Sequence, residues 1–126
     1  MKEIITSSNA PPPVGPYSQG VALGGFIFLS GQVGRKTDTT ELEIGVTAQT
    51  RQAILNMQAV LAEKNLTLAN VVKTSVFLAD MNDFAEMNAV YAEFFDEDTA
   101  PARSTIEVAR LPLDASMEID AIASLD

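Results

Sequence analysis

The chain has 126 residues, and we expect one domain over residues 1–126. It contains no cysteine and no histidine, which excludes disulfides and thiolate chemistry and argues against the usual zinc sites. The formal net charge of -9 argues against nucleic acid as the main ligand, because binding to phosphates needs a basic surface.

No apolar run approaches the length of a transmembrane helix, and the N-terminus lacks the basic and then apolar pattern of a signal peptide. We therefore expect a cytoplasmic protein that does not enter membranes. Without histidine, any acid–base catalyst must be a carboxylate, a lysine, a tyrosine or water. An anionic small substrate would need a local arginine to overcome the acidic field of the molecule.

The N-terminal part of the chain predicts short strands separated by turns. Residues 2–6 form a strand candidate, and residues 7–16 are irregular because several prolines interrupt them. Strands over 19–23 and 26–30 follow, joined by a two-glycine hairpin turn. Tyr17, between the irregular segment and this hairpin, is either a packing residue or a tyrosine that faces a ligand with its hydroxyl free to donate.

The segment Ser30-Gly31-Gln32 ends the second strand of the hairpin. Its glycine either marks a bulge or strand end, or lets a ligand or another backbone approach closely. A polar surface loop is predicted for residues 33–45, followed by an amphipathic helix over 46–64 and a strand over 71–78. This order of strand, helix and strand predicts a βαβ unit.

A second helix is predicted to begin at Asp83, with one face rich in apolar side chains. Asn88 lies on or beside this buried face, where an amide is costly unless it is hydrogen-bonded. It is therefore either a satisfied structural amide or an amide that reaches a polar pocket. Two further strands, over 101–108 and 116–123, complete the chain.

The alternation of side chains in the last two strands points to a polar pair. Ile106 and Val108 share one face of the first strand, so Arg103 points the other way, and Glu118 likewise points away from the apolar face of the second strand. If both apolar faces look at a common core, Arg103 and Glu118 lie on the same polar face of the sheet. They are then either a cross-strand ion pair worth about 0.2–1 kcal/mol, or a cation and a carboxylate that hold an anionic substrate and move its protons.

These elements predict an α+β fold in which a mixed six-stranded sheet carries two helices on one face. The open face would combine charged and apolar side chains, and such a composition favours burial of the face against another surface. We therefore expect the protein to oligomerise through its open sheet face, with sites between subunits.

Several short motifs occur in a fixed order along the chain. They are Gly15-Pro16-Tyr17-Ser18-Gln19-Gly20, Ser30-Gly31-Gln32, Val72-Lys73-Thr74, Met81-Asn82-Asp83-Phe84 with Asn88, Pro101-Ala102-Arg103-Ser104, Glu107-Val108-Ala109-Arg110-Leu111-Pro112 and Glu118-Ile119-Asp120-Ala121-Ile122-Ala123. Each motif is weak alone, but all of them in this order are highly specific. Through them essentially the whole chain resembles the RidA (YjgF) family, the reactive intermediate/imine deaminases.

The resemblance implies a chorismate-mutase-like fold and a homotrimer with its helices outside and its active sites in the clefts between subunits. It implies hydrolysis of reactive 2-imino acids, such as 2-iminobutanoate and 2-iminopropanoate, to 2-oxo acids and ammonia. No metal or organic cofactor is implied, and the ligands are small 2-imino and 2-oxo acids.

The same resemblance implies roles for individual residues. Arg103 corresponds to the arginine that grips the substrate carboxylate, and Glu118 to the acid beside the attacking water. The remaining matched positions line the pocket, and they are Tyr17, Ser30, Gly31, Asn88 and Thr105. Several relatives carry cysteine where this chain has Thr105, but the backbone carbonyl at that position can still serve.

Two other functions remain open from the sequence. The first is a non-enzymatic member of the same superfamily that binds small carboxylates, which would need Arg103 but not Glu118. The second is a ribonuclease or translation inhibitor, which the acidic balance and the missing histidines disfavour. The presence of both Arg103 and Glu118 favours the enzyme.

Overall fold

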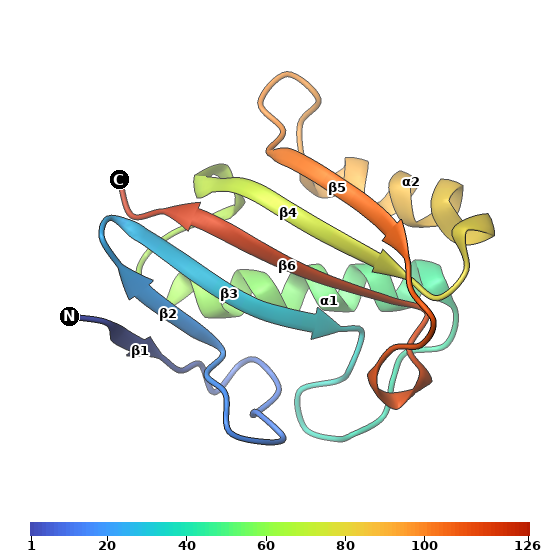
Figure 1. Ribbon diagram of the computed structural model, residues 1–126, viewed down its shortest axis with the longest axis horizontal. Helices are drawn as coiled ribbons and strands as arrows, with labels where there is room; N and C mark the ends of the chain where they lie inside the picture. Colours follow the sequence, from blue (N-terminus) through green and yellow to red (C-terminus); the bar gives the residue numbers. More distant parts are fainter.

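The computed structural model describes all residues 1–126 and consists of one six-stranded sheet with two α-helices packed on one of its faces (Figure 1). This confirms the predicted α+β fold. The strands are β1 (Glu3–Ile5), β2 (Gly20–Leu23), β3 (Phe26–Val33), β4 (Val71–Leu78), β5 (Ala102–Glu107) and β6 (Met117–Ser124). The helices are α1 (Val46–Ala62) and α2 (Phe84–Phe94), with short 3₁₀ turns at Leu68–Asn70, Met81–Asp83 and Pro112–Asp114.

The sheet has the strand order β1-β2-β3-β6-β4-β5 and is mixed, as predicted. β6 lies inside the sheet and is antiparallel to both β3 and β4, whereas β4 and β5 are parallel. A parallel pair needs a crossover connection, and α2 supplies it between β4 and β5. The predicted unit of β3, α1 and β4 forms, but β6, the last strand of the chain, is inserted between its two strands.

The core lies between the two helices and the sheet. The apolar stripe of α1 contributes the fully buried Ile54, Met57 and Leu61, which belong to the same cluster as Ile119 of β6. Full burial of one such side chain stabilises the fold by about 1.5–3 kcal/mol. No helix combines the length and the apolar character that a membrane crossing requires.

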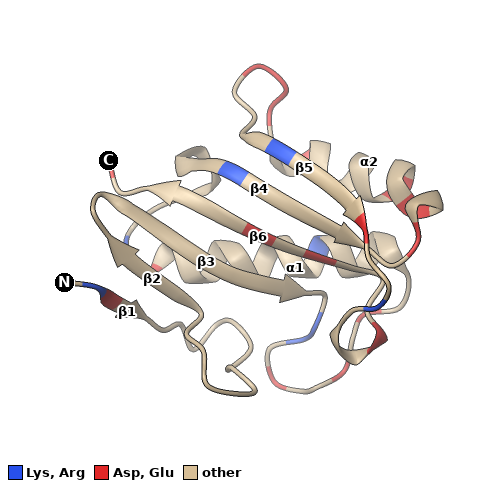
Figure 2. Cartoon of the chain, viewed as in Figure 1, with Lys and Arg blue, Asp and Glu red and all other residues tan.

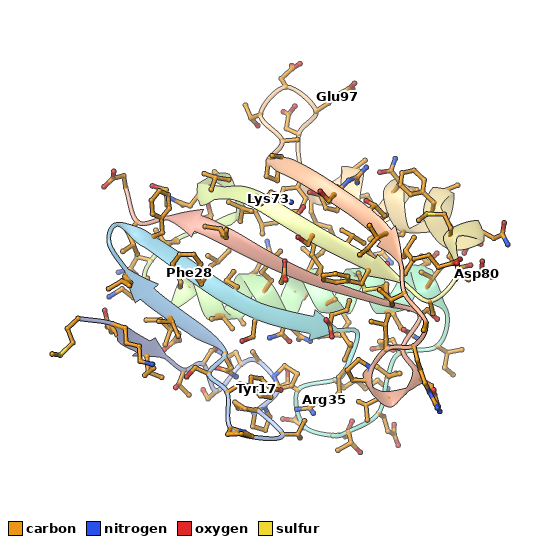
Figure 3. All side chains as sticks on the ribbon, in the orientation of Figure 1. Tyr17, Phe28, Arg35, Lys73, Asp80 and Glu97 are labelled. Atoms are coloured by element: carbon orange, nitrogen blue, oxygen red, sulfur yellow. The ribbon has the colours of Figure 1, made fainter.

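The opposite face of the sheet is uncovered in the single chain and carries large apolar side chains. Phe28, labelled in Figure 3, is 45% exposed, and Phe26 and Ile106 are similarly exposed. The charged side chains on this face include Glu118 and Asp120 of β6 and Lys73 of β4, and Figure 2 shows acidic positions on β6 and a basic one on β4. This mixture of apolar and charged side chains is the composition that the sequence predicted for the open face.

Candidate functional site

A bulge near the end of β3 shapes the site. The register between β3 and β6 passes from Leu29 opposite Ala121 to Gln32 opposite Ile119, so β3 advances by one residue more than β6. An extra residue of this kind bends the strand and redirects its side chains. The bulge that the sequence suggested at Ser30-Gly31-Gln32 is therefore confirmed.

Gly31 in this bulge is pressed against a carboxylate. A Cβ atom at Gly31 would lie 2.7 Å from Oε2 of Glu118 and 2.8 Å from its Cδ. The group that approaches the glycine is therefore the side chain of Glu118 and not another backbone. Any larger residue at Gly31 would displace the carboxylate.

Glu118 is half-buried and points to the open side of the sheet, because it alternates with the buried Met117 and Ile119. It takes part in none of the three ion pairs of the chain. Burial raises the pKa of the Glu118 carboxyl, and the neighbouring charge of Asp120 raises this pKa further. A carboxyl group with a raised pKa is better matched to proton transfer near neutral pH.

A cavity of about 490 Å³ opens beside Glu118. Its walls come from the proline-rich segment, the end of β3 and the turn that precedes β6. Four predicted site residues therefore meet at this cavity: Tyr17, Ser30, Gly31 and Glu118. The complete lining is Pro11, Pro12, Val14, Tyr17, Gln19, Ser30, Gly31, Gln32, Val33, Arg35, Pro112, Leu113 and Glu118.

The buried side chain of Gln19 holds the irregular N-terminal segment in place. Its Oε1 accepts a hydrogen bond of 2.6 Å from the backbone N–H of Ser7, and its Nε2 donates to the carbonyl of Pro11 at 2.9 Å. The backbone of Ser30 donates to the carbonyl of Gln19 at 3.0 Å. These bonds fix the segment against the bulge of β3, although it forms no regular structure.

Tyr17 lies at the edge of this cavity and is 48% exposed, which rules out a role as a buried packing residue. Its hydroxyl accepts a hydrogen bond from the backbone N–H of Val14 at 3.3 Å. The hydroxyl proton of Tyr17 remains available to a ligand.

Arg103 lies on the other side of the sheet, which corrects the sequence prediction. In the parallel pair of β4 and β5, Arg103 lies opposite Thr74, and Thr74 is fully buried against Tyr91 of α2. Residues paired in this way point to the same face, so Arg103 faces the helices while Glu118 faces the open side. The prediction that they share one polar face is wrong, and a cross-strand ion pair between them is excluded.

The difference lies at Ile106, whose apolar side chain predicts the core face of β5. Ile106 lies opposite Phe77 of β4 on the open face and is half-exposed in the single chain. The open face is itself apolar, so an apolar residue on β5 does not distinguish the core from the open side.

On the helix side of β5, one hydrogen bond and two aromatic rings hold the Arg103 guanidinium in position. Its Nη1 donates to Oδ1 of Asn88 at 2.8 Å, and its Cζ lies 4.6 Å from the ring centroid of Tyr91 and 5.6 Å from that of Phe84. Such cation–π contacts contribute about 0.5–2 kcal/mol each. The side-chain oxygen of Asn88 is thus hydrogen-bonded, and its partner is the arginine of the predicted site.

Arg103 and Asn88 line a second hollow, of about 560 Å³, that is separate from the Glu118 cavity. Since β5 and β6 are two strands apart, the backbones at Arg103 and Glu118 are offset sideways by about 10 Å. Thr105 lines neither hollow, and its Oγ1 is buried without a partner. Within one chain, six of the seven predicted site residues therefore form two groups, and Thr105 belongs to neither.

Arg35 lines the Glu118 cavity and was missed by the sequence prediction, which placed it in a surface loop. It is buried, and its backbone carbonyl accepts a hydrogen bond of 2.9 Å from Asn56 of α1. The sequence signal for Arg35 as a site residue was its position, because it is a basic residue four positions after Gly31 in a chain with a net negative charge. The predicted loop pattern hid this signal.

The family model for endoribonuclease L-PSP matches residues 7–125. The chain belongs to the endoribonuclease L-PSP family. The motifs indicated a resemblance to the RidA (YjgF) family. Relatives that are named imine deaminases and the solved structure of the YjgF gene product from E. coli confirm it.

A RutC family protein from Synechocystis is 51% identical and the match covers 98% of this chain and 96% of that protein. The 2-iminobutanoate/2-iminopropanoate deaminase of Escherichia coli K12 is 48% identical, with 98% of each chain covered. The crystal structure of E. coli TdcF with bound serine has a TM-score of 0.91 and 44% identity, over 97% of this chain and 98% of that one. L-PSP relatives thus carry several names, and close homologues include named imine deaminases.

Proposed function

We propose that this protein is a cytoplasmic deaminase that hydrolyses reactive 2-imino acids, such as 2-iminobutanoate and 2-iminopropanoate, to 2-oxo acids and ammonia. The observation that carries the proposal is the Glu118 carboxyl, which lies against Gly31 in an open cavity and has a pKa raised by burial. The deaminase name of a relative that is 48% identical over nearly its whole length supports the same activity.

In the proposed reaction, Glu118 takes a proton from a water molecule as the water oxygen forms a bond to C2 of the iminium group. Glu118 then gives this proton to the nitrogen of the resulting amino alcohol. The C2–N bond breaks with its electron pair leaving on ammonia, the hydroxyl proton passes to the Glu118 carboxylate, and a 2-oxo acid and ammonia are released. The iminium carbon is already electrophilic, so one carboxylate that orients and deprotonates water is sufficient. General-base catalysis of this kind contributes roughly 10²–10⁴ in rate.

We propose that Arg103 of a neighbouring subunit binds the substrate carboxylate. This would explain why the two groups of site residues lie on opposite faces of the sheet in one chain. A second copy covering the open face would also bury Phe28 and Ile106, and the proposed assembly is a homotrimer. Each charge-assisted bond from the guanidinium would contribute about 1.5–3 kcal/mol, while Asn88 and the two aromatic rings hold its orientation.

The other matched residues complete the proposed site. Tyr17 can donate its hydroxyl proton to the substrate, and the bulge at Ser30 and Gly31 can present backbone groups to it. The role proposed for Thr105 is limited to its backbone carbonyl. The second candidate function is binding of small carboxylates without catalysis, which the bound serine of TdcF favours.

The test is to generate 2-iminobutanoate in situ with a threonine dehydratase, in the presence of a nucleophile that traps it. We expect the wild-type protein to prevent trapping and Arg103→Ala to lose this protection while keeping its oligomeric state. Arg51→Ala, which removes an arginine from an exposed ion pair with Glu93, should protect as the wild type does. A folded protein that binds 2-oxobutanoate but gives no protection would favour the binding function instead.

A further inference from the structure

Arg35 is a buried cation whose surroundings do not neutralise it. The residue is only 6% exposed, although it comes from a polar loop. Its Nη2 donates to the carbonyl of Pro12 at 2.8 Å, and its Nε is buried without any partner. A guanidinium has five N–H donors, so most of the hydrogen-bonding capacity of Arg35 is not used within the chain.

No carboxylate of the chain pairs with Arg35. The three ion pairs, defined by N–O distances within 4.0 Å, join Arg51 to Glu93, Lys64 to Glu3 and Arg110 to Asp114. A buried charge without a counter-ion is costly, and a fold usually retains one only where a partner completes it. The Pro12 carbonyl supplies a dipole to Arg35 but no opposite charge.

The cavity that Arg35 lines is the cavity of Glu118, and these two residues are its only charged lining groups (Figure 3 labels Arg35 and Tyr17, which lie near each other at one edge of the molecule). No ion pair joins Arg35 and Glu118 across this cavity. The volume of about 490 Å³ lies within the range of cavities that hold ligands much larger than a four-carbon acid. There is room for a ligand that reaches from Glu118 to Arg35.

We propose that Arg35 binds a second carboxylate, at the end of the substrate side chain, so that the site accepts 2-imino dicarboxylic acids. The inference rests on the proposed function, because it takes Glu118 as the reacting end of the cavity. The planar guanidinium suits a carboxylate, with which it can form paired charge-assisted hydrogen bonds. Because the net charge of -9 repels dianions, a local cation is needed to admit them.

The test uses two stable analogues of the reaction product that differ in one charge, 2-oxoglutarate and its 5-methyl ester. Calorimetric titration of the wild-type protein should show 2-oxoglutarate binding about ten- to a hundredfold more tightly than the ester. Equal binding of the two compounds to the wild-type protein would overturn the inference without any variant.

Variants then assign the charge preference to Arg35. Arg35→Gln should bring the affinity for 2-oxoglutarate down to that of the ester, and Arg35→Lys should keep part of the difference. The matched control is Lys36→Gln, which removes one positive charge from the next, exposed position outside the cavity lining and should change neither affinity. An equal loss in Lys36→Gln and Arg35→Gln would mean that only the overall charge matters, and would overturn the proposal.

Binding and turnover separate this inference from the proposed function. If 2-iminobutanoate is hydrolysed but the two analogues bind equally, the deaminase stands and the role of Arg35 fails. If the analogues are distinguished through Arg35 but no imine is hydrolysed, the deaminase fails and the cavity is a dicarboxylate-binding site. Thermal unfolding of each variant checks that the loss of the Pro12 contact has not unfolded the protein.

Discussion

At the scale of single residues, the chemistry of Glu118 depends on where β6 places it. The alternation of β6 was readable from the sequence, and it correctly predicted that Glu118 points away from the core. Its raised pKa was not readable, because that depends on the packing that half-buries the carboxyl and on the nearby charge of Asp120. Arg35 was missed for a related reason, since only the folded loop buries it.

The raised pKa of Glu118 predicts a particular pH dependence. The proposed base acts when deprotonated, so kcat/KM should rise with pH through a pKa above the ordinary value of 4.5. Asp120→Asn should shift this rise to lower pH, because it removes the like charge that raises the pKa. Glu118→Gln should remove the rise and lower kcat by roughly 10²–10⁴. An unchanged pH profile in Glu118→Gln would remove this residue from the mechanism.

The same pKa shift gives a second, independent readout in unfolding experiments. The folded state binds the proton of the Glu118 carboxyl more tightly than the unfolded state does. The stabilisation that this proton gives the folded protein is therefore present below pH 4.5 and is lost as the pH rises through the pKa of Glu118 in the folded state. Glu118→Gln should therefore raise Tm at pH 7 and have a smaller effect at pH 4. A lower Tm at pH 7 would show that the carboxylate is stabilised in the assembled protein.

At the scale of elements, the strands and helices followed from periodicity and the bulge of β3 was one of the alternatives that its glycine offered, whereas the facing of β5 was predicted wrongly. Alternation assigns the two faces of a strand but cannot say which face is the core when both faces are partly apolar. That is why Ile106 misled the prediction for Arg103. The end of β3 is similar, because the sequence marked Gly31 as a place of close approach but could not identify the group that approaches it, the side chain of Glu118.

Gly31 in β3 and Gly34, which directly follows β3, predict opposite outcomes when each is changed to alanine. At Gly31 the added Cβ meets the mobile end of the Glu118 side chain, so Gly31→Ala should keep a nearly wild-type Tm but lose most of its turnover. At Gly34 it would lie 2.5 Å from the backbone oxygen of Gln49 in α1, which cannot move without shifting the helix. Gly34→Ala should lose at least about 1–3 kcal/mol of stability. Tm and turnover of both variants test this contrast, which fails if Gly31→Ala is fully active.

At the scale of the whole molecule, the main question is what covers the open face of the sheet. The sequence predicted that this face mixes apolar and charged side chains, and the structure shows exposed aromatic residues and Glu118 on it, but Arg103 was wrongly placed there. How copies of the chain would arrange themselves on it depends on surface complementarity, which neither periodicity nor motif spacing describes. The proposed trimer is therefore best tested on this face directly.

Phe28→Asp should disrupt the proposed trimer, because it would bury a charge between subunits. Leu55→Asp is the matched control, since Leu55 of α1 is 44% exposed and Phe28 is 45% exposed, but Leu55 lies on a helix and not on the open face. Analytical ultracentrifugation should show monomers only for Phe28→Asp, and turnover should be lost with the assembly. If both variants had the same molecular mass in solution, the subunit interface would not include Phe28.

The placement of Arg103 and Glu118 on opposite faces has a consequence for mixtures of defective chains. If each site takes its arginine from one subunit and its acid from the next, Arg103→Ala and Glu118→Gln subunits should complement each other when they are refolded together. Random mixing in a closed ring would give about a quarter of the sites both intact groups, and turnover should recover to about that fraction. Two individually inactive proteins would then regain activity through assembly, and no recovery would mean that each chain builds its site alone.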